Sequence, residues 1–329
     1  MIEDGTPVDI NYMLSDQRLH INNEPDKKLS EQKIVEKRPT KFKDYIGQTK
    51  AKKILKGFII GTKQRKTQFP HLLIHGPAGC GKTTLAKIMA NELQYPFIEI
   101  IASEISSAEE MVELVRNNEN ALVFLDEIHG LKRDFVEPLY PLMEDFKWQG
   151  EQISPFTLIG ATTEIGEIIK NRKPFYDRFI LKQELENYTS YHIQKIITNV
   201  NNKQYSDMLL PDNVLQLIAK NSRNTPRIGI GLLQSTIYLN GNVEMTLNSN
   251  NIIHNGFTHT DLKALNVIAK HNRGIGVQAI ASFLGTSIDN YTYQIEPWLL
   301  STGCVMRTNK GRMITNYGVK MIKLLERVK

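Results

Sequence analysis

The chain contains few of the features that mark secreted, metal-binding or membrane proteins. Only two cysteines occur in its 329 residues, Cys80 and Cys304, and they lie far apart without metal-ligand spacing. We therefore expect reduced thiols and neither a disulfide framework nor a zinc site. No stretch approaches the roughly 18 apolar residues that span a bilayer. Residues 1–16 also lack the basic start and apolar block of a secretory signal, so we expect a cytoplasmic protein without membrane contact.

Aromatic and apolar residues are also scarce in residues 1–35, which are rich in Asp, Asn, Glu and Lys. A segment of this kind buries too little apolar surface to offset the entropy lost on ordering, so we expect a flexible arm. The chain as a whole is 41% hydrophobic and 23% charged, which is typical of globular proteins. Its length favours two or three domains.

The balance of charges is basic, with a formal net charge of +6. Lysine and arginine displace counterions from phosphates, so this charge is compatible with a nucleic-acid partner. Many basic proteins bind no nucleic acid, and the charge alone does not decide the question.

We expect the first domain at residues 36–187, and from residue 42 to about residue 179 helical stretches alternate with short apolar runs. The runs occupy residues 71–75, 97–101, 121–125 and 156–160. Apolar strands separated by helices predict a parallel sheet that helices cover on both faces. The predicted fold class of this domain is therefore α/β.

Two further domains are expected after it. Residues 188–256 lose the strand pattern and show helical periodicity, which predicts a small helical domain. In residues 257–329 we expect three helices followed by a two-strand ribbon, at 260–271, 277–284, 291–301, 305–308 and 312–315, with a turn at Asn309-Lys310-Gly311. Three helices and a ribbon are typical of a winged-helix domain.

The strongest local signal is a glycine-rich loop between an apolar run and a helical stretch. It reads Gly76-Pro77-Ala78-Gly79-Cys80-Gly81-Lys82-Thr83 and is followed by Thr84. In such a P-loop, backbone N–H groups close around phosphates, the lysine reaches the β- and γ-phosphates, and Thr83 ligates Mg²⁺. ATP and Mg²⁺ are the ligands that this pattern predicts; the alternative is an ordinary glycine-rich turn. Cys80 is unusual in this loop and is either sensitive to oxidation or an inert small residue.

Two acidic residues, Asp126 and Glu127, follow the third apolar run. At a strand end beside a P-loop, Asp126 would ligate the metal, and Glu127 would polarise a water for in-line attack on the γ-phosphate. The alternative is that both acids merely solvate the end of a strand.

Three more residues complete the expected site. After the fourth run, Thr163, ahead of Thr162, could orient the attacking water; the alternative is an ordinary helix N-cap. Arg178 and Arg227 could stabilise charge on the γ-phosphate, as arginines from neighbouring subunits do in such ATPases. Alone, each arginine would more often be a surface salt-bridge partner.

These blocks together resemble the RuvB family of AAA+ branch-migration ATPases, from residue 37 to the C-terminus. The matching blocks are Arg38-Pro39 and residues 44–48, 76–84, 125–129, 139–146, 155–163, 225–228, 296–300 and 307–312. Several of them are peculiar to RuvB rather than shared by all AAA+ ATPases. The resemblance implies a P-loop AAA+ domain, a small helical lid domain and a C-terminal winged helix.

The resemblance also implies a function and roles for individual residues. RuvB is a hexameric ring that encircles duplex DNA and, with RuvA, uses ATP to drive branch migration of Holliday junctions, which are four-way DNA junctions. The residues expected near the nucleotide are Lys37, Arg38, Tyr45, Ile46, Glu144, Asp145, Phe146 and Tyr188. Arg178 would be the finger offered to the neighbouring subunit, and Arg227 the sensor of the γ-phosphate in its own subunit. Arg307, Lys310 and Arg312 would place the wing on DNA; the alternative is that they only solvate the ribbon.

The chain departs from the family where RuvB binds RuvA. RuvB carries a long β-hairpin there, whereas residues 147–154 of this chain suffice only for a tight turn. The segment 164–176 is longer than its counterpart and has Phe175-Tyr176 in place of Leu-Arg. Since every nucleotide-handling residue is present, we expect loss of a partner contact rather than of ATPase activity. Whether a RuvA-like or a replacement partner binds stays open.

Three functions remain open on the sequence alone. The first is an oligomeric, ATP-driven translocase on duplex or branched DNA. The second is an ATP-switched loader or adaptor that recruits a replication or recombination protein, with residues 1–35 as the recruiting arm. The third is a relic without turnover, which the presence of Lys82, Asp126, Glu127 and Arg178 argues against.

Overall fold

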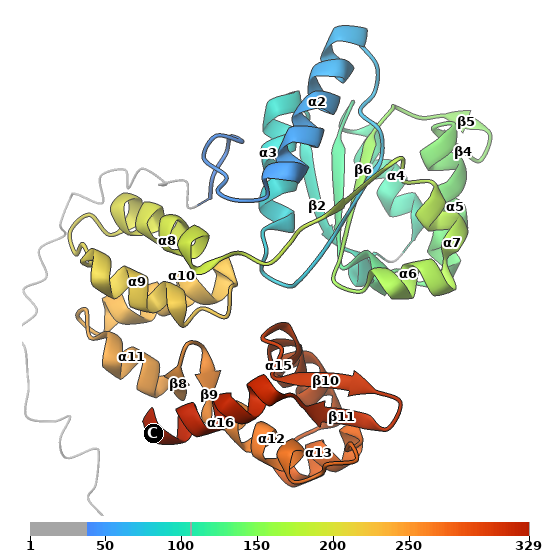
Figure 1. Cartoon of the computed structure of the whole chain (residues 1–329). Coiled ribbons are helices and arrows are strands. Elements are labelled where there is room, and N and C mark those ends of the chain that lie inside the picture. Colours follow the sequence, from blue (N-terminus) through green and yellow to red (C-terminus); the bar gives the residue numbers. More distant parts are fainter. Residues whose placement is uncertain (1–37, 106, 329) are drawn as a thin grey trace, which may run out of the picture. The chain divides into compact units, whose positions relative to one another are not determined.

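The computed structural model describes residues 38–105 and 107–328 (Figure 1). The predicted arm, residues 1–35, and Lys37 lie outside the described residues. Within the described part, no helix has both the length and the apolar character needed to cross a membrane.

A five-stranded parallel sheet forms the centre of the first domain. Its strand order is β2-β3-β6-β1-β7, with β1 (Leu72–His75), β2 (Phe97–Ile101), β3 (Leu122–Asp126), β6 (Thr157–Thr162) and β7 (Leu181–Glu184). Every paired couple of strands in it is parallel. The predicted α/β fold is confirmed. Because the carboxyl ends of β1, β3 and β6 meet at one edge, the loops that follow them lie together there.

The last strand of this sheet, β7, was missing from the sequence prediction. It pairs with β1 in register from Leu72↔Leu181 to His75↔Glu184 and forms one edge of the sheet. Only Leu181 of its four residues is buried. An edge strand of mostly polar residues has no apolar run to mark it. The sheet domain therefore continues beyond Phe179, where the predicted alternation ended.

Helices cover both faces of the sheet (Figure 1). One layer contains α2 (Thr49–Arg65) and α3 (Lys82–Leu93), and the other contains α4 (Ala108–Arg116), α5 (Arg133–Glu144), α6 (Ile165–Asn171) and α7 (Lys173–Asp177). Leu72 and Ile74 pack in the first layer, whereas Leu73 packs in the second. This alternation is the two-residue period of a strand that is buried on both faces. Two 3₁₀ turns, η1 (Ala102–Glu104) and η2 (Ile128–Gly130), follow β2 and β3.

A very short hairpin follows α5. Its strands are β4 (Lys147–Trp148) and β5 (Glu151–Gln152), paired as Lys147↔Gln152 and Trp148↔Glu151. The two turn residues, Gln149 and Gly150, both have positive φ, 49° and 86°, as a two-residue hairpin turn with the twist of its strands requires. The prediction of a tight turn at residues 147–154 is confirmed.

Four helices build the second domain: α8 (Ser190–Gln204), α9 (Asp212–Lys220), α10 (Pro226–Tyr238) and α11 (Val243–Ser249). The expectation that strands are absent up to residue 256 is wrong. β8 (Ile252–His254) pairs with β9 (Phe257–Thr258) around Asn255 and Gly256, whose φ angles are 47° and 80°. Asn-Gly is a strong hairpin signal, and here it overrides the helical pattern around it.

The third domain is a winged helix. It consists of α12 (His259–Ala269), α13 (Val277–Leu284), α14 (Ile288–Asn290), the π-helical η3 (Tyr291–Ile295), α15 (Glu296–Ser301), the wing strands β10 (Val305–Thr308) and β11 (Gly311–Ile314), and α16 (Asn316–Val328). The helix predicted at 291–301 starts earlier and contains a π turn. Pro297 has no N–H to offer the carbonyl four residues before it, which accounts for the disturbed bonding there. The final helix, α16, was not predicted; it buries Met321, Ile322 and Leu325.

Candidate nucleotide-binding site

The glycine-rich loop connects β1 to α3. Its glycines adopt backbone conformations that residues with a side chain rarely adopt. Gly76, Gly79 and Gly81 have φ angles of 143°, 74° and 94°. A Cβ on Gly76 would lie 2.3 Å from the carbonyl oxygen of Leu185, and one on Gly81 would lie 2.7 Å from the Tyr45 hydroxyl. These positions therefore require glycine, and the loop can present its N–H groups to a ligand.

The start of α3 is suited to bind an anion. Its N-cap is Gly81, no side chain caps the first turn, and the first turn contains no acidic residue. The free N–H groups and the positive end of the helix dipole therefore face the loop. ATP phosphates fit such an arrangement, and Pro77 and Ala78, which are exposed, form the outer side of the loop.

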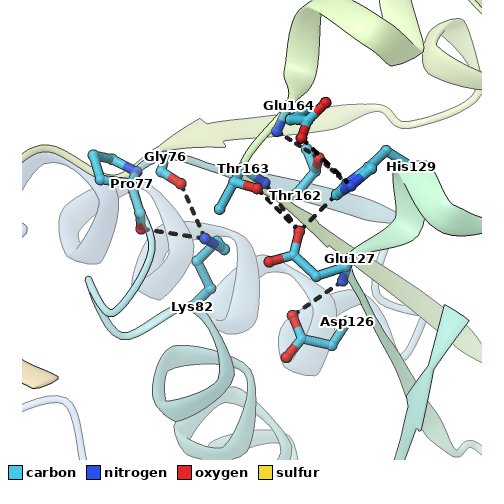
Figure 2. Close-up of polar contacts among 9 residues, drawn as sticks. All are labelled: Gly76, Pro77, Lys82, Asp126, Glu127, His129, Thr162, Thr163 and Glu164. Atoms are coloured by element: carbon cyan, nitrogen blue, oxygen red, sulfur yellow. Dashed lines mark hydrogen bonds and ion pairs between the residues drawn. The ribbon is translucent and has the colours of Figure 1, made fainter. Parts of the chain in front are cut away.

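Lys82 adds the positive charge. Its side chain is largely buried, and Nζ donates to the carbonyl oxygens of Gly76 at 2.9 Å and Pro77 at 3.2 Å (Figure 2). Burial lowers the pKa of its ammonium group, while Glu127 and Asp126 act in the opposite direction. A buried ammonium held by neutral carbonyls can exchange them for phosphate oxygens, with a gain in electrostatic energy.

Asp126 ends β3 and supplies a carboxylate beside the loop. Its Oδ1 accepts a hydrogen bond from the Glu127 N–H at 3.1 Å (Figure 2). Burial raises the pKa of the Asp126 carboxyl, and the neighbouring Glu127 raises it further. A divalent cation would relieve this repulsion. Among the described residues no cluster of three or more His, Cys, Asp or Glu side chains is placed to hold a metal. Mg²⁺ in P-loop sites needs few protein ligands, and Thr83 with Asp126 fits that role.

Glu127 has a strained backbone and a well-defined set of neighbours. Its φ and ψ are 48° and 52°, a left-handed conformation that is uncommon for a glutamate and that clusters at functional sites. Its Oε2 accepts from the Thr163 hydroxyl at 3.2 Å and from the Thr163 N–H at 3.3 Å (Figure 2). Of the two threonines, Thr163 is therefore the one that contacts Glu127. Thr162 is fully buried, and its hydroxyl accepts from the Glu164 N–H at 2.9 Å.

His129 belongs to this network and was given no role on the sequence. Its Nδ1 lies 3.3 Å from Glu127 Oε2 and 3.1 Å from Thr162 Oγ1 (Figure 2). Only one residue, Ile128, separates His129 from the acidic pair in the chain. That proximity was the available signal, but the geometry depends on the 3₁₀ turn η2, which the sequence did not reveal.

Arg178, the predicted finger, is held by residues of its own subunit. Its guanidinium carbon lies 3.6 Å from the centroid of the Tyr140 ring, and Nη1 donates to the Pro174 carbonyl at 2.8 Å. Its Nε lies 2.9 Å from Glu144 Oε1, an ion pair without the alignment of a hydrogen bond. Glu144 was predicted near the nucleotide, and in the structure it contacts Arg178.

Some of the remaining predicted residues lie beside the P-loop, and others do not. Tyr45 is buried against the P-loop, with its hydroxyl 3.3 Å from the Gly81 carbonyl oxygen, and Tyr188 packs against Gly47. Arg227 starts α10, and its Cβ lies 2.9 Å from where a Cβ on Gly79 would be. By contrast, Phe146 is partly buried and packs against the rings of His71 and Phe156, away from the P-loop. Of the others, Arg38 and Asp145 are exposed, and Ile46 and Thr84 are partly buried.

Cys80 has a buried side chain at the base of the loop. Burial raises the pKa of its thiol to about 11, against the opposing effects of Lys82 and Arg227. A thiol that stays protonated and buried is unreactive. The structure therefore favours the interpretation of Cys80 as an inert small residue.

The wing places two of the three predicted DNA-contacting residues around a buried carboxylate. Glu296 is fully buried, and Oε2 accepts from Arg307 Nη2 at 2.7 Å and from Arg312 Nη2 at 3.1 Å. The side chain of Arg312 is 19% exposed, but that of Arg307 is 57% exposed. Lys310 stands at the exposed turn. Arg312 is thus mainly a partner of Glu296, whereas Arg307 and Lys310 still present charge to solvent.

Comparison with known proteins agrees with this geometry. A family model described as Holliday junction DNA helicase RuvB P-loop domain matches residues 37–185, and one described as RuvB C-terminal winged helix domain matches residues 254–323. The RuvB subunit of the Holliday junction branch migration complex of Campylobacter hominis is 37% identical over 302 residues, which are 84% of this chain and 87% of that protein. Its counterpart from Mycoplasma genitalium is 32% identical and covers 87% of this chain and 97% of that protein.

A solved structure gives the same result. The Thermotoga maritima RuvB Holliday junction branch migration motor superposes with a TM-score of 0.76 at 33% identity, and the match covers 87% of this chain and 98% of that one. The P-loop and winged-helix domains of this chain both match, and they match the same family. The chain therefore belongs to the RuvB family of P-loop ATPases.

Proposed function

We propose that this chain is the motor subunit of a RuvB-type machine, which hydrolyses ATP to move duplex or four-way junction DNA in the cytoplasm. Its subunits would form a ring, hexameric as the family resemblance implies. The observation that carries the proposal is the convergence of Lys82, Glu127 and Thr163 at one edge of the sheet. The names of the relatives, subunits of a Holliday junction branch migration complex, supply the class of DNA.

The chemistry follows from the chain's own side chains. The P-loop N–H groups and Lys82 bind the β- and γ-phosphates, and Thr83 with Asp126 would hold Mg²⁺, which offsets phosphate charge. Glu127 accepts a hydrogen bond from the attacking water and orients it in line with the γ-phosphate. Arg178 of a neighbouring subunit stabilises the charge that develops there.

Substitution of Glu127 tests the hydrolytic step. We expect Glu127→Gln to lower DNA-stimulated ATP turnover by about 100-fold or more, because the amide cannot polarise water as a carboxylate does. Nucleotide affinity should stay close to that of the parent, since Lys82 and the loop are unchanged. Steady-state hydrolysis with and without four-way junction DNA, together with titration of a fluorescent ATP analogue, measures both. Turnover that DNA does not affect in the parent would contradict the motor.

A mixing experiment tests the shared site. Lys82→Ala removes phosphate binding from one site, and Arg178→Ala removes the finger from the adjacent one. Each variant alone should be inactive. In mixed rings, some interfaces combine an intact Lys82 with an intact Arg178, so part of the activity should return. Failure of any mixture to regain hydrolysis would show that Arg178 does not act across an interface.

The wing supplies the proposed DNA contact. Lys310 at the turn and the exposed part of Arg307 would approach the phosphate backbone, because both present charge outside the Glu296 cluster. Arg312 would support them indirectly, through its ion pair with Glu296. Replacing Lys310 by Gln should weaken binding to all DNA sequences alike and reduce its salt dependence.

The short β4–β5 hairpin bears on the partner of the motor. The β4–β5 hairpin ends after two residues on each side, so we propose that a conventional RuvA does not bind through it. This observation favours one second candidate, an ATP-switched loader or adaptor that recruits a replication or recombination protein through residues 1–35. Deletion of that arm should then abolish capture of the partner and leave ATP turnover intact; unchanged capture would exclude the loader.

A further inference from the structure

The residues around Glu127 Oε2 suggest how the carboxylate is oriented. Three groups approach this one oxygen: the Thr163 N–H, the Thr163 hydroxyl and Nδ1 of His129. The other oxygen of Glu127 points toward the side on which Lys82 lies (Figure 2). One oxygen of the carboxylate is thus held, and the other is directed to where the phosphates would bind.

His129 is placed firmly enough to contribute to this arrangement. It lies in the 3₁₀ turn η2 directly after β3, and its side chain is only 23% exposed. Its Nδ1 lies 3.1 Å from the hydroxyl of Thr162, a fully buried residue of β6. That hydroxyl accepts the Glu164 N–H, which fixes its oxygen in place. On its other side, His129 Nε2 lies 3.8 Å from Glu164 Oε1. The ring therefore has contacts at both nitrogens.

We propose that His129 is a positioning residue for Glu127: Nδ1, which is hydrogen-bonded to Thr162, also lies 3.3 Å from Oε2, and this polar contact restricts the plane of the carboxylate. The inference rests on the proposed function, in which Glu127 orients the attacking water. Thr163 holds the carboxylate only weakly, because it is exposed and both of its bonds, at 3.2 and 3.3 Å, are at or beyond the upper end of the usual hydrogen-bond range. His129 adds a third contact from the 3₁₀ turn η2, whereas Thr163 follows β6, and this contact restricts rotation of the carboxylate.

The geometry predicts which nitrogen matters. The amide nitrogen of an asparagine can take the place of Nδ1, whereas that of a glutamine takes the place of Nε2. His129→Ala should therefore lower the turnover number about tenfold, the effect of losing one polar contact to a charged group. The KM for ATP should change little, because His129 lies outside the P-loop. His129→Asn should recover most of the lost turnover, and His129→Gln should recover little.

The test measures ATP turnover, KM and nucleotide affinity for the full chain and these three variants, with and without four-way junction DNA. A further pair, Glu127→Gln with and without His129→Ala, completes a double-mutant cycle. If His129 acts through Glu127, its removal should have no further effect once Glu127 is Gln. If His129→Ala fails to fold, the comparison of Asn with Gln still decides.

Two kinds of failure can be told apart. Equal turnover of the Asn and Gln variants, an unchanged turnover number in His129→Ala, or a loss confined to KM would overturn the positioning role while Glu127→Gln remains inactive. Substantial turnover in Glu127→Gln itself would remove the proposed water-orienting role of Glu127, and the inference about His129 with it.

Discussion

His71 joins three parts of the ATPase domain through its two ring nitrogens. Nδ1 accepts from the Leu158 N–H of β6 at 2.9 Å, so the proton must lie on Nε2, which is 2.9 Å from the Met143 carbonyl oxygen at the end of α5. The residue itself directly precedes β1. Burial lowers its pKa from 6.5 to about 4, and the bond to Met143 opposes this only in part. The ring is therefore kept neutral.

This pKa predicts a dependence of stability on pH. In the unfolded chain His71 takes up a proton near its ordinary pKa of 6.5, but in the folded chain it does so only near 4. Between these values the unfolded state binds more protons, so the free energy of unfolding should fall as pH drops from 6.5 to 4, by about 3 kcal/mol. Urea unfolding at several pH values measures this.

The control for His71 is His71→Asn, whose side-chain oxygen can still accept the Leu158 N–H. Burial also lowers the pKa of His75, so only the difference between parent and variant reports on His71. We expect a less stable variant with a smaller loss over this pH range. Parallel curves for the two proteins would show that His71 does not titrate as proposed.

How far single residues can be predicted depends on how local their contacts are. The glycines, Lys82 and the acidic pair are fixed by a motif contiguous in the chain, and the structure brings them to one place. The contact of Glu144 with Arg178 joins α5 to the end of α7. No local pattern contains such a pairing, since it depends on how two helices pack on the same face of the sheet.

The boundaries of the helices and strands are also predictable only where they depend on the local sequence pattern. α13 begins and ends where its apolar period predicts, because core packing and propensity agree there. η3 deviates because Pro297 removes one donor from a helix that continues past it. β7 is polar on an edge, and the hairpin at Asn255-Gly256 interrupts a helical pattern. Predictions fail where one residue or an exposed edge outweighs the periodicity.

The charge of the buried Glu296 carboxylate makes the stability of the winged-helix domain depend on pH. Burial alone would raise the pKa of its carboxyl, but hydrogen bonds and charge from Arg312 and Arg307 outweigh burial and leave the pKa below its ordinary value. A folded pKa below the unfolded one stabilises the protein above the unfolded pKa, about 4.3 for glutamate. This contribution is lost as pH falls further.

Removal of this charge should therefore destabilise the domain. Glu296→Gln leaves Arg312, which is mostly buried, without its counter-charge, and we expect the free energy of unfolding to fall by about 3 kcal/mol. Arg307→Gln is the matched control and should cost less, because that side chain is 57% exposed. Urea unfolding of the full chain measures both, and equal losses would show that leaving Arg312 without its counter-charge has no extra cost.

At the scale of the whole molecule, the loop between α9 and α10 connects different domains. It contacts α12 of the winged-helix domain and Tyr188, and it leads into α10 beside the P-loop. Arg223 and Asn224 in it both have left-handed backbones, with φ of 48° and 56°. Arg223 pairs with Asp261, a buried residue at the start of α12, and Nε donates to the Gly256 carbonyl at 2.8 Å. The Asn224 carbonyl oxygen accepts from the Tyr188 N–H. Arg227, in the first turn of α10 directly after this loop, lies beside Gly79 of the P-loop.

The Arg223–Asp261 pair should couple the second and third domains in stability. Burial raises the pKa of Asp261, and Arg223 lowers it by less. The ion pair therefore offsets the cost of burying the carboxylate only in part. Loss of either partner alone leaves a buried charge and should cost about 3 kcal/mol, whereas Arg223→Met with Asp261→Ala should cost clearly less than the sum. Urea unfolding of the four proteins gives the coupling, and strict additivity would show that the domains are joined by other contacts.

The way in which Arg178 is held bears on assembly of the ring. A free arginine gives up about 2 kcal/mol of rotamer entropy when it is fixed in one conformation. Here stacking on Tyr140 and the ion pair with Glu144 have already restricted the side chain within the isolated subunit. If subunits associate through this side chain, their interface does not have to immobilise it, and more of the binding free energy is left for affinity between neighbours.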